Sequence, residues 1–595
     1  MMRENNMSPA APRIIAERID RPRDRVLFWA LTATVAGAVV AVGLYWWSLE
    51  DRHAYPLLFV LISGLLLFHL AVWSGRWFTL LTMRAPVPVA PEPGLRVAAV
   101  TTFHPDSEPL EMLERTAQAI AAMRYPHDTW VLDEGDSAEV KELCKRLGVQ
   151  HYTRLHKPEY HGKTGPFQTE TKHGNYNAWL RDVGYGRYDY LVGFDTDHIP
   201  EPGFLDRVLG YFRDPGVGYV QTPQIYYNQS ASFIARGAAE ETYAYYSSHQ
   251  MASYAVGHPI LTGCHNAQRL SALCEVGSIP AHDAEDLLLT LRYRAHGWRG
   301  VYVPEILAMG ITPVDWAGYL RQQMRWARAV LDIKIREYPE LMWRLRPIER
   351  AAGFLHGLYY LRALTFPVLY GLVAWLVATG VEPAFVSWAA LGRVGLAALA
   401  IIVADRFRQN FYLDPKREAG LHWRALLLQF AKWPFLILAA WRALIGRPRR
   451  YDVTQKARRN PVSSSFAMVH IAIAGLMSAA WLVGTEFSNV STPMTLICLA
   501  IVLVSVALAW TATWQYPQPF DPALADQRSS ELSDLFELRL RSTPHKPIER
   551  KGVVTVDGDE ERRVLANGRH QGALRLTPGS EGSRNNVRDR FRTQL

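Results

Sequence analysis

The segment YLVGFDTDHIP, residues 190–200, decides the fold, because a short apolar run ends there at two carboxylates. The apolar part has the length and composition of a buried β-strand, and Asp195 and Asp197 follow it directly. In an open α/β sheet, ligands bind outside the carboxyl ends of the strands. Two carboxylates at such an end, next to His198, suit a hard divalent cation that takes phosphate oxygens as further ligands. A solvated Asp-x-Asp turn would give the same local pattern, so the surrounding chain has to decide between the two interpretations.

The chain has 595 residues, which is enough for two or three domains. Two apolar stretches, residues 26–47 and 56–75, and several more after residue 360 have the roughly 20 residues that cross a bilayer as a helix. Residues 95–340 between them have the mixed, charged composition of a soluble domain. The sequence therefore predicts an integral membrane protein that carries a large α/β domain on one side of the bilayer.

Charges around the first apolar stretch predict the orientation. Arginines are frequent in residues 13–25 before it, whereas residues 50–53 after it are mixed in charge, so we expect a cytoplasmic N-terminus. After two spans the large domain is then also cytoplasmic, in a multi-pass protein of the cell membrane. A cleaved signal peptide is disfavoured, because the apolar run is longer than an h-region and no small-x-small site follows it. The net charge of +9 fits loops beside anionic lipid, and no nucleic-acid partner is predicted.

Four cysteines are present, and their spacing resembles neither a CxxC motif nor a metal site. They are Cys144, Cys264, Cys274 and Cys498. This pattern fits a reducing compartment, and it predicts no zinc site.

From residue 94 onward, strand and helix patterns alternate. We expect strands at residues 97–103, 128–132, 149–155, 190–194 and 216–223, and helices at 109–123 and 175–183. Such alternation predicts a mostly parallel sheet covered on both faces. The sheet is expected to end near residue 303.

Four further polar clusters lie at the ends of predicted elements. They are WVLDEGDS with Asp133 and Glu134, KHGNYN with Lys172, AHDAEDLLL with Asp283, Glu285 and Asp286, and YLRQQMRW with Gln322, Arg325 and Trp326. Each cluster also has a purely structural explanation. Acidic residues in the first turn of a helix interact favourably with the helix dipole, and the last cluster fits an amphipathic helix at a membrane surface. Lys172 precedes a helix whose N-terminal N–H groups can hold an anion.

Taken in order, these motifs resemble those of the membrane-embedded family 2 glycosyltransferases, and among them the cellulose synthase type. VLDEGD matches the family's Asp-Asp-Gly strand end, KHGN its Lys-x-Gly-Asn, FDTDH its Phe-Asp-x-Asp-His, AED its Thr-Glu-Asp, and QQMRW its Gln-(Gln/Arg)-x-Arg-Trp. YDVTQK, residues 451–456, is similar to the family's gating loop. The resemblance covers roughly residues 95–515, and the Thr-Glu-Asp and Gln-(Gln/Arg)-x-Arg-Trp motifs are typical of processive members.

The sequence also departs from that family. Three motif positions carry a different residue from the family's: Glu134 replaces an Asp, Ala284 a Thr and Tyr451 a Phe. LTGCHN, residues 261–266, replaces a Phe-Cys-Gly motif beside the acceptor sugar, and residues 162–175 are expanded. We therefore expect a changed acceptor pocket.

The resemblance implies a role for each matching residue. Asp195 and Asp197 would hold Mg²⁺ or Mn²⁺, and Asp286 would be the general base. The nucleotide diphosphate would be bound by Asp133, Glu134, Lys172, Asp195, Arg325, Thr454 and Lys456. The acceptor sugar would contact Gln322, Trp326, Gly263, Cys264 and Glu285.

The implied organisation is a GT-A (Rossmann-like) α/β domain inserted between α-helical transmembrane segments. We expect a tail and two transmembrane helices in residues 1–90 and the GT-A domain in 91–345. Interface helices, a gating loop (447–460) and about four transmembrane helices would occupy 346–515, and a largely disordered cytoplasmic tail 516–595. Residues 421–441 are interpreted as an interfacial helix, because Arg424, Lys432 and Pro434 interrupt them. No cyclic-dinucleotide motif occurs in the tail.

The predicted function is processive, inverting transfer from a UDP-sugar, favouring UDP-glucose, into a β-linked glucan that passes through the membrane. The expected partners are the UDP-sugar, the growing polysaccharide, the bilayer and accessory proteins of the cell envelope. The alternatives are a β-1,3- or mixed-linkage glucan synthase, an amino-sugar polymer synthase, a non-processive transferase acting on a lipid carrier, and a transporter with a degenerate domain.

Overall fold

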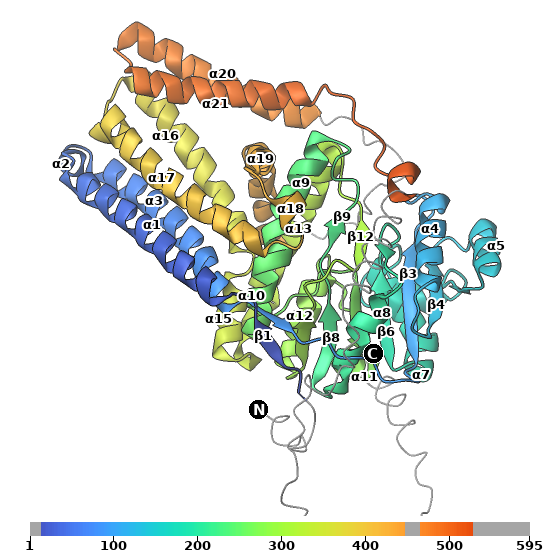
Figure 1. Ribbon diagram of the computed structural model, residues 1–595. Helices are drawn as coiled ribbons and strands as arrows, with labels where there is room; N and C mark the ends of the chain where they lie inside the picture. Colours follow the sequence, from blue (N-terminus) through green and yellow to red (C-terminus); the bar gives the residue numbers. More distant parts are fainter. Residues whose placement is uncertain (1–12, 447–463, 527–595) are drawn as a thin grey trace, which may run out of the picture.

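The computed structural model describes residues 13–446 and 464–526, in which an α/β domain lies against a group of long helices (Figure 1). The domain is built on a seven-stranded sheet in the order β11-β8-β10-β6-β3-β4-β5. Its strands are β3 (Val97–Phe103), β4 (Asp128–Asp133), β5 (Gln150–Tyr152), β6 (Tyr190–Phe194), β8 (Val217–Gln221), β10 (Asn266–Arg269) and β11 (Arg299–Tyr302). The predicted GT-A fold class, a mostly parallel α/β sheet beside membrane-length helices, is confirmed.

One strand of this sheet runs against its neighbours. β10 pairs antiparallel with both β6 and β8, whereas all the other neighbours in the sheet pair in parallel. It was not predicted from the sequence. β3 lies directly beside β6, so the carboxyl ends of these two strands meet at one edge of the sheet.

The sheet is buried on both faces, as the apolar runs of its strands predict. In β3, Val97 and Ala99 join one hydrophobic cluster, while Ala98 and Val100 join another on the opposite face. Successive side chains of a strand point to opposite faces, so a run without polar residues needs cover on each side. The helices of the domain are α4 (Leu110–Ala121), α5 (Ala138–Leu147), α6 (Lys172–Trp179), α8 (Phe204–Val208), α9 (Phe233–Ala244), α10 (Gln250–Ala255), α11 (Leu270–Glu275), α12 (Glu285–Ala295) and α13 (Trp316–Arg336).

A small second sheet extends from the end of β6. It has the order β7-β12-β9, with β7 at Ile199–Pro200, β12 at Ala308–Gly310 and β9 at Ile225–Tyr226. The chain leaving β12 passes the second carboxylate, where Ile311 N donates to Asp197 Oδ2 at 3.4 Å. It then enters α13, whose N-cap Asp315 accepts from Gly318 N at 2.7 Å. The small sheet therefore fixes the start of α13 beside the carboxyl end of β6.

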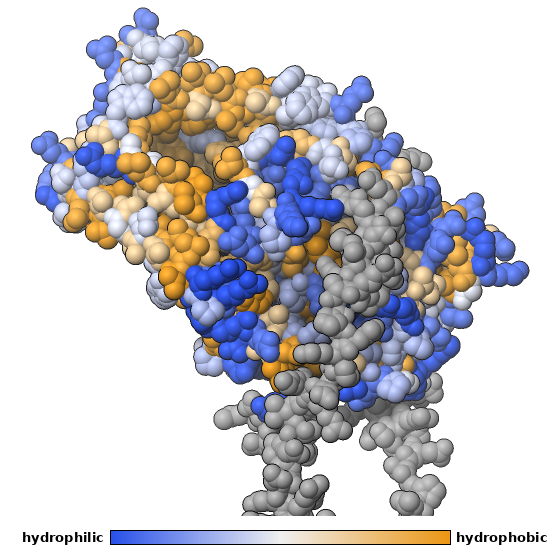
Figure 2. Space-filling view, viewed as in Figure 1, coloured by the Kyte–Doolittle hydropathy of each residue, from blue (hydrophilic) through white to orange (hydrophobic). Residues whose placement is uncertain are grey.

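Seven helices among the described residues are long and apolar enough to cross a membrane. They are α1 (Pro22–Ser48), Pro56–Thr82 with α3 (Pro56–Phe78), Pro347–Thr379 with α16 (Thr365–Thr379) at its end, Trp388–Phe411 with α17 (Trp388–Arg408), α19 (Trp423–Ile445), Ser465–Phe487 of α20 (Ser464–Phe487), and α21 (Thr492–Thr511). Figure 2 shows hydrophobic residues gathered over this group of helices, whereas much of the α/β domain's surface is hydrophilic. Arg393, in the second turn of α17, lies with its guanidinium carbon 4.0 Å from the ring centroid of Tyr45 in α1.

Helix α19 is the stretch for which an interfacial position was predicted, and that position stays a prediction. Its Lys432 is 1% exposed and lies against the α/β domain. Lys432 Nζ donates to Glu241 Oε1 of α9 at 2.7 Å and to Gln323 Oε1 of α13 at 3.1 Å. The charge inside this apolar helix is thus used in a contact between the helix and the domain.

The chain returns to the α/β domain after α21. Residues 516–526 lie along it, with Ala525 fully buried and Asp526 ion-paired with Arg115 of α4. This first part of the predicted disordered tail is therefore packed on the domain. The rest of that tail, residues 527–595, and the predicted gating loop, 447–460, lie outside the described residues.

Candidate active site

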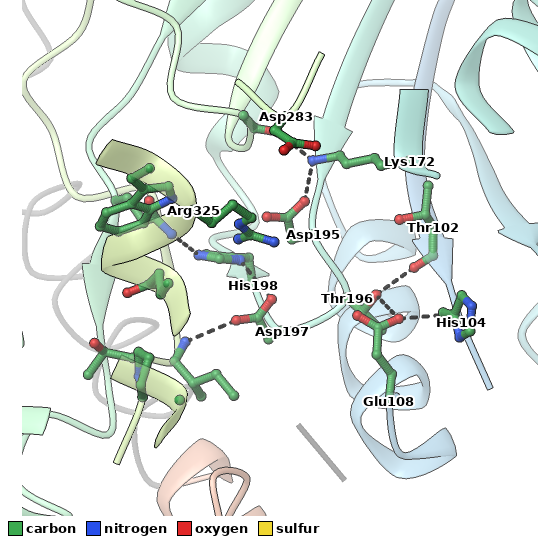
Figure 3. A pocket seen from close by; sticks show the side chains of 18 of the residues that line it. Thr102, His104, Glu108, Lys172, Asp195, Thr196, Asp197, His198, Asp283 and Arg325 are labelled. Carbon is green, nitrogen blue, oxygen red and sulfur yellow. Dashed lines mark hydrogen bonds and ion pairs between the residues drawn. The ribbon is translucent and has the colours of Figure 1, made fainter. Parts of the chain in front are cut away.

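A pocket of about 240 Å³ opens at the carboxyl ends of β3 and β6 (Figure 3). It collects residues from the distant motifs that the sequence singled out. The predicted residues that line it are Glu134, Lys172, Asp195, Asp197, Gly263, Glu285, Asp286, Gln322, Arg325 and Trp326. The interpretation of these motifs as unrelated capping and turn features does not account for this convergence.

Asp195 and Asp197 lie in a tight turn at the floor of the pocket, where His198 N donates to the Asp195 carbonyl at 3.0 Å. One ligand atom from each of Asp195, Asp197 and His198 lies within 4.8 Å of the other two. The two carboxylates at this spacing can ligate a divalent cation, and carboxylate oxygens are the ligands that Mg²⁺ and Mn²⁺ favour. The residues at this position therefore fit a catalytic metal.

Lys172 points from the first turn of α6 into the pocket. Its Nζ donates to the carbonyl oxygen of Gly263 at 2.6 Å and is ion-paired with Asp195. Burial alone lowers the pKa of Lys172, but the charges of Asp195, Tyr176 and Glu285 and the hydrogen bond to Asp195 together outweigh it and hold that pKa above its usual value. A cation is thus fixed beside the first carboxylate.

The tight packing at the start of α6 requires a glycine at position 174. Thr171 caps α6 by accepting from Gly174 N at 3.1 Å. A Cβ on Gly174 would lie 2.2 Å from the carbonyl oxygen of Gln168, which is backbone and cannot move aside cheaply. The KHGN motif therefore has a structural reason for its glycine as well as a placed lysine.

Glu285 and Asp286 begin α12 on the opposite wall. Asp286 Oδ1 accepts from Leu287 N at 2.7 Å, and a Cβ on Gly263 would lie 3.4 Å from Asp286 Oδ2. Burial raises the pKa of both carboxyls, and the neighbouring charge of Asp286 adds to the shift at Glu285, whose pKa rises to about 7. A carboxylate with a raised pKa in a pocket is a better proton acceptor than a solvated one.

Helix α13 supplies the third wall. Gln322, Arg325 and Trp326 lie within about one turn of each other and all line the pocket. The helix is also anchored near this point, since Tyr319 Oη donates to a Glu241 carboxylate at 2.6 Å. α13 therefore presents polar and aromatic side chains to the pocket from a fixed position.

Asp133 and Glu134, at the end of β4, have different surroundings. Asp133 is fully buried and accepts from Gly135 N at 2.9 Å and Ser137 N at 2.7 Å, and it does not line the pocket. Glu134 does, and it is paired with the buried Arg154, whose Nη2 lies 2.6 Å from Glu134 Oε1. The role of Asp133 in nucleotide binding stays a prediction.

Arg154 also organises the expanded loop before α6. Its guanidinium donates to the carbonyl oxygens of Tyr160 at 3.1 Å and Gln168 at 3.0 Å. Glu170 N in turn donates to Glu134 at 3.0 Å, so the loop is tied to the end of β4. One buried cation therefore connects the strand end and the loop that flank the pocket.

Several pocket residues were missed by the sequence analysis. Glu108 Oε2 accepts from His104 N at 3.0 Å and from Thr196 Oγ1 at 2.8 Å, which joins the end of β3 to the Asp195–Asp197 turn. Pro519, from the segment after the last helix, lines the pocket as well. FHPDSE directly after a predicted strand was an available signal for Glu108, but no local pattern points to Pro519.

Among the described residues, Cys264 is a further predicted site residue that does not line the pocket. Cys264 is 1% exposed and lies behind it, with Sγ 3.9 Å from His198 Nε2. Thr454 and Lys456 fall outside the described residues.

Comparison with known proteins adds to this geometry. Residues 93–329 match the family model for "Glycosyltransferase like family 2". The cellulose synthase catalytic subunit (UDP-forming) of Pseudomonas fluorescens strain SBW25 is 27% identical over 362 residues, which are 58% of this chain and 46% of that protein. The corresponding subunit of Xanthomonas axonopodis pv. citri strain 306 is 26% identical over 289 residues, which are 46% of this chain and 38% of that protein.

Residues 93–329 are therefore similar to family 2 glycosyltransferases, and the two relatives just named are cellulose synthase catalytic subunits. Both alignments span less than half of the relative's own length. Among solved structures, a mannosyltransferase from Pyrobaculum calidifontis in complex with GDP-Man and Mn²⁺ is 16% identical, with a TM-score of 0.42, and covers 71% of this chain and 100% of its own. Glucosyl-3-phosphoglycerate synthase from Mycobacterium tuberculosis is 13% identical, with a TM-score of 0.29, and covers 40% of this chain and 78% of its own.

Proposed function

We propose that this glycosyltransferase domain is an enzyme that transfers glucose from UDP-glucose to the end of a β-glucan, inverts the configuration at C1, and extends the chain processively. The proposal is carried by one observation: Asp195, Asp197 and Asp286 share a single pocket with three side chains of α13. Two carboxylates for a metal, a basic carboxylate and an aromatic platform are what transfer from a nucleotide sugar to a hydroxyl group requires.

The donor would bind across the carboxylate turn. Asp195 and Asp197, with His198 beside them, would hold Mg²⁺ or Mn²⁺. Such a cation, when bound, would hold the diphosphate oxygens and offset the negative charge that develops on the leaving group. Lys172 and Arg325 line the same pocket and would donate to the phosphates.

Asp286 would accept the proton of the attacking hydroxyl. Its carboxylate lies on the wall formed by the start of α12, next to the loop that contains Gly263. Attack on C1 from the face opposite the diphosphate inverts the anomeric centre, so an α-linked donor gives a β-linked product. General-base catalysis of this kind contributes about 10²- to 10⁴-fold to the rate.

The acceptor chain would lie on α13. Trp326 offers a ring on which the terminal sugar stacks, and Gln322 lies one turn earlier to bond its hydroxyl groups. Glu285, Gly263 and the neighbouring Cys264 would shape this end of the pocket. Because LTGCHN differs from the family's motif here, the linkage is the part of the proposal that product analysis must decide.

The membrane part would receive the polymer. We place the glycosyltransferase domain on the cytoplasmic side of the cell membrane, where nucleotide sugars are available, and the helices around it would pass the chain outward. The apolar helices support a membrane location, and the arginines before α1 support this orientation. Thr454 and Lys456 of the YDVTQK segment would add contacts to the diphosphate.

The test is UDP release by the detergent-purified chain against UDP-glucose, UDP-N-acetylglucosamine and UDP-galactose, with Mg²⁺ or Mn²⁺, followed by digestion of the product with linkage-specific glucanases. We expect release with UDP-glucose and a high-molecular-weight product that a β-1,4-glucanase degrades. If only a β-1,3-glucanase degrades the polymer, the proposed mechanism stands and the proposed linkage changes from β-1,4 to β-1,3. No UDP release with any donor would overturn the proposal, and a single added sugar would overturn processivity.

A further inference from the structure

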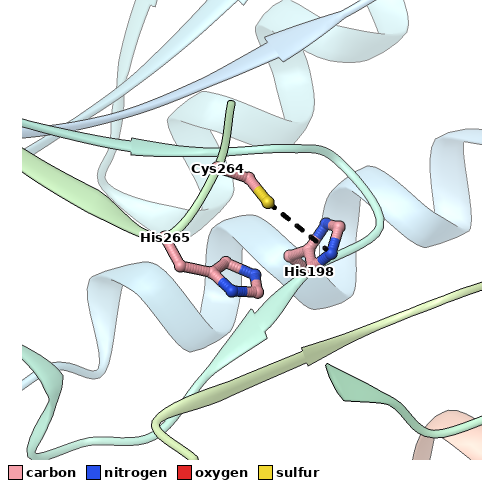
Figure 4. Close-up of side chains that lie close together, drawn as sticks. All are labelled: His198, Cys264 and His265. Carbon is pink, nitrogen blue, oxygen red and sulfur yellow. Dashed lines mark hydrogen bonds between the residues drawn. The ribbon is translucent and has the colours of Figure 1, made fainter. Parts of the chain in front are cut away.

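Three ligand-bearing side chains meet directly behind the carboxylate turn (Figure 4). One ligand atom from each of His198, Cys264 and His265 lies within 4.8 Å of the other two, and all three residues are at most 1% exposed. They come from two loops, one after β6 and one before β10. Because the loops are distant in sequence, the spacing of the cysteines could not indicate this cluster.

The hydrogen bonds of His198 leave its Nε2 as the nitrogen that faces the thiol. Asp197 Oδ1 lies 3.3 Å from Nδ1 and favours a proton there. Tyr246 Oη donates to Gln224 Oε1 at 2.8 Å, so the amide nitrogen of Gln224 faces His198 Nε2 at 3.1 Å and donates to it. Nε2 therefore carries a lone pair, 3.9 Å from Cys264 Sγ.

His265 is oriented in the same way. Its Nδ1 lies 3.3 Å from the carbonyl oxygen of Pro223, which can only accept, so Nδ1–H donates a hydrogen bond to it. Its Nε2 is buried and has no hydrogen-bond partner among the described residues. A histidine whose one nitrogen donates to a carbonyl oxygen or a carboxylate while the other presents a lone pair has the arrangement of a metal-ligating histidine.

The backbone at His265 is also unusual. Its φ is +51°, in the left-handed region that favours glycine. This residue stands in LTGCHN, the stretch in which the chain departs from the cellulose synthase motif. Strained non-glycine residues of this kind cluster at ligand-binding sites.

We propose that His198, Cys264 and His265 form a binding site for a thiophilic divalent cation of the zinc class, separate from the two-carboxylate site. Two imidazole nitrogens and a thiolate are soft and borderline ligands, which favour zinc over Mg²⁺ or Mn²⁺. Nitrogen and sulfur ligands of a tetrahedral zinc lie about 3.3 to 3.6 Å apart, so the observed Sγ to Nε2 separation needs only a small contraction. The sequence-based prediction of no zinc site is thus replaced by this proposal.

The proposed cation site connects to the active-site pocket, and a cation bound there would affect the donor site. His198 and Gln224 both line the active-site pocket, so a cation can enter from it, and binding exchanges the Gln224 hydrogen bond for a bond to the metal. The bound cation would join the turn after β6 to the loop of residues 261–266. That loop supplies the Gly263 carbonyl that holds Lys172, so the cation would stiffen the support of the donor site.

The test uses the full-length chain, purified in detergent under reducing conditions, stripped of metal and then loaded with Co²⁺ in the presence of excess Mg²⁺. We expect a thiolate-to-cobalt charge-transfer absorption band, about one equivalent of bound Zn²⁺ that displaces the cobalt, and a higher melting temperature with Zn²⁺. Excess Mg²⁺ occupies the carboxylates, and the charge-transfer band reports only on a thiolate ligand.

The variants Cys264→Ser and His265→Gln should abolish the band or weaken Zn²⁺ binding at least tenfold. Cys274→Ser, a change of the same kind in α11, should keep both. Absence of the band in the wild-type chain would overturn the proposal without any variant, as would an unchanged band in Cys264→Ser. These readouts do not depend on glycosyl transfer, so the proposed function and the zinc site can fail separately.

Discussion

The Nζ atom of Lys172 lies 2.6 Å from the carbonyl oxygen of Gly263 and also forms an ion pair with Asp195. Through this one side chain the first turn of α6, the end of β6 and the loop before β10 are held together. Gly263 in turn lies against Asp286, the proposed base. The lysine therefore connects the side of the pocket proposed for the donor with the side proposed for the acceptor.

Replacing Lys172 by Met should lower kcat/KM for the UDP-sugar about 10²-fold, because the pocket loses a charged donor to the diphosphate. The measurement is UDP release as a function of donor concentration. Lys145→Met, which removes an exposed lysine of α5, is the matched control and should behave like the wild type. An unchanged kcat/KM in Lys172→Met would contradict the role given to this residue.

The pH dependence of transfer should report on the Glu285 and Asp286 pair. Asp286 must be ionised to accept a proton, and burial raises its pKa, so the rate should fall as the pH drops through a value above that of an ordinary aspartate. Glu285→Gln removes the adjacent negative charge and should lower the pKa of Asp286. The acidic limb of kcat/KM should then move to lower pH, and a shift to higher pH would contradict the assignment.

Shortening Trp326 to Ala should reduce polymer yield by about tenfold or more, since the acceptor sugar loses a large apolar contact. Trp326→Phe keeps an aromatic face and should retain most of the product length, as measured by size-exclusion chromatography. Trp343→Ala, at an exposed tryptophan outside the pocket, is the control. Equal product length in Trp326→Ala and the wild type would argue that the ring only packs against its neighbours.

The buried pair of Lys432 and Glu241 should show strong coupling in stability. Lys432→Met leaves the Glu241 carboxylate without its cation and should cost about 3–5 kcal/mol of unfolding free energy. Adding Glu241→Gln should restore much of that loss, because no unpaired charge remains. Thermal unfolding in detergent measures both, with the exposed Lys416→Met as control, and additive losses in the double variant would contradict the pairing.

Much of the fold was predictable because apolar runs mark buried parallel strands. The stretch from Val97 to Phe103 was predicted and observed with the same bounds, and the strand before Asp195 likewise ends where its carboxylates begin. β10 was missed because NAQR carries no apolar alternation. It forms a strand through pairing with β6 and β8, which no local pattern encodes.

The residues of the candidate site likewise fall into two groups: those marked by a local sequence pattern and those that only the fold brings together. Motif residues such as Asp286 and Trp326 could be named in advance, because each lies in a recognisable local pattern. The pairing of Arg154 with Glu134, the approach of Pro519 and the cluster of Cys264 with His265 depend on segments that meet only in three dimensions. These long-range contacts distinguish this pocket from the motifs that it shares with the family.

The most direct test of the central claim is UDP release from UDP-glucose by the wild-type chain and by Asp286→Asn, measured in parallel with the β-glucan formed. The account predicts that the substitution lowers both by about 10²- to 10⁴-fold, because it removes the proton acceptor. Asp206→Asn, the same change at a partly exposed aspartate of α8 outside the pocket, should leave both unchanged. Equal UDP release and polymer yield from wild type and Asp286→Asn would contradict the account.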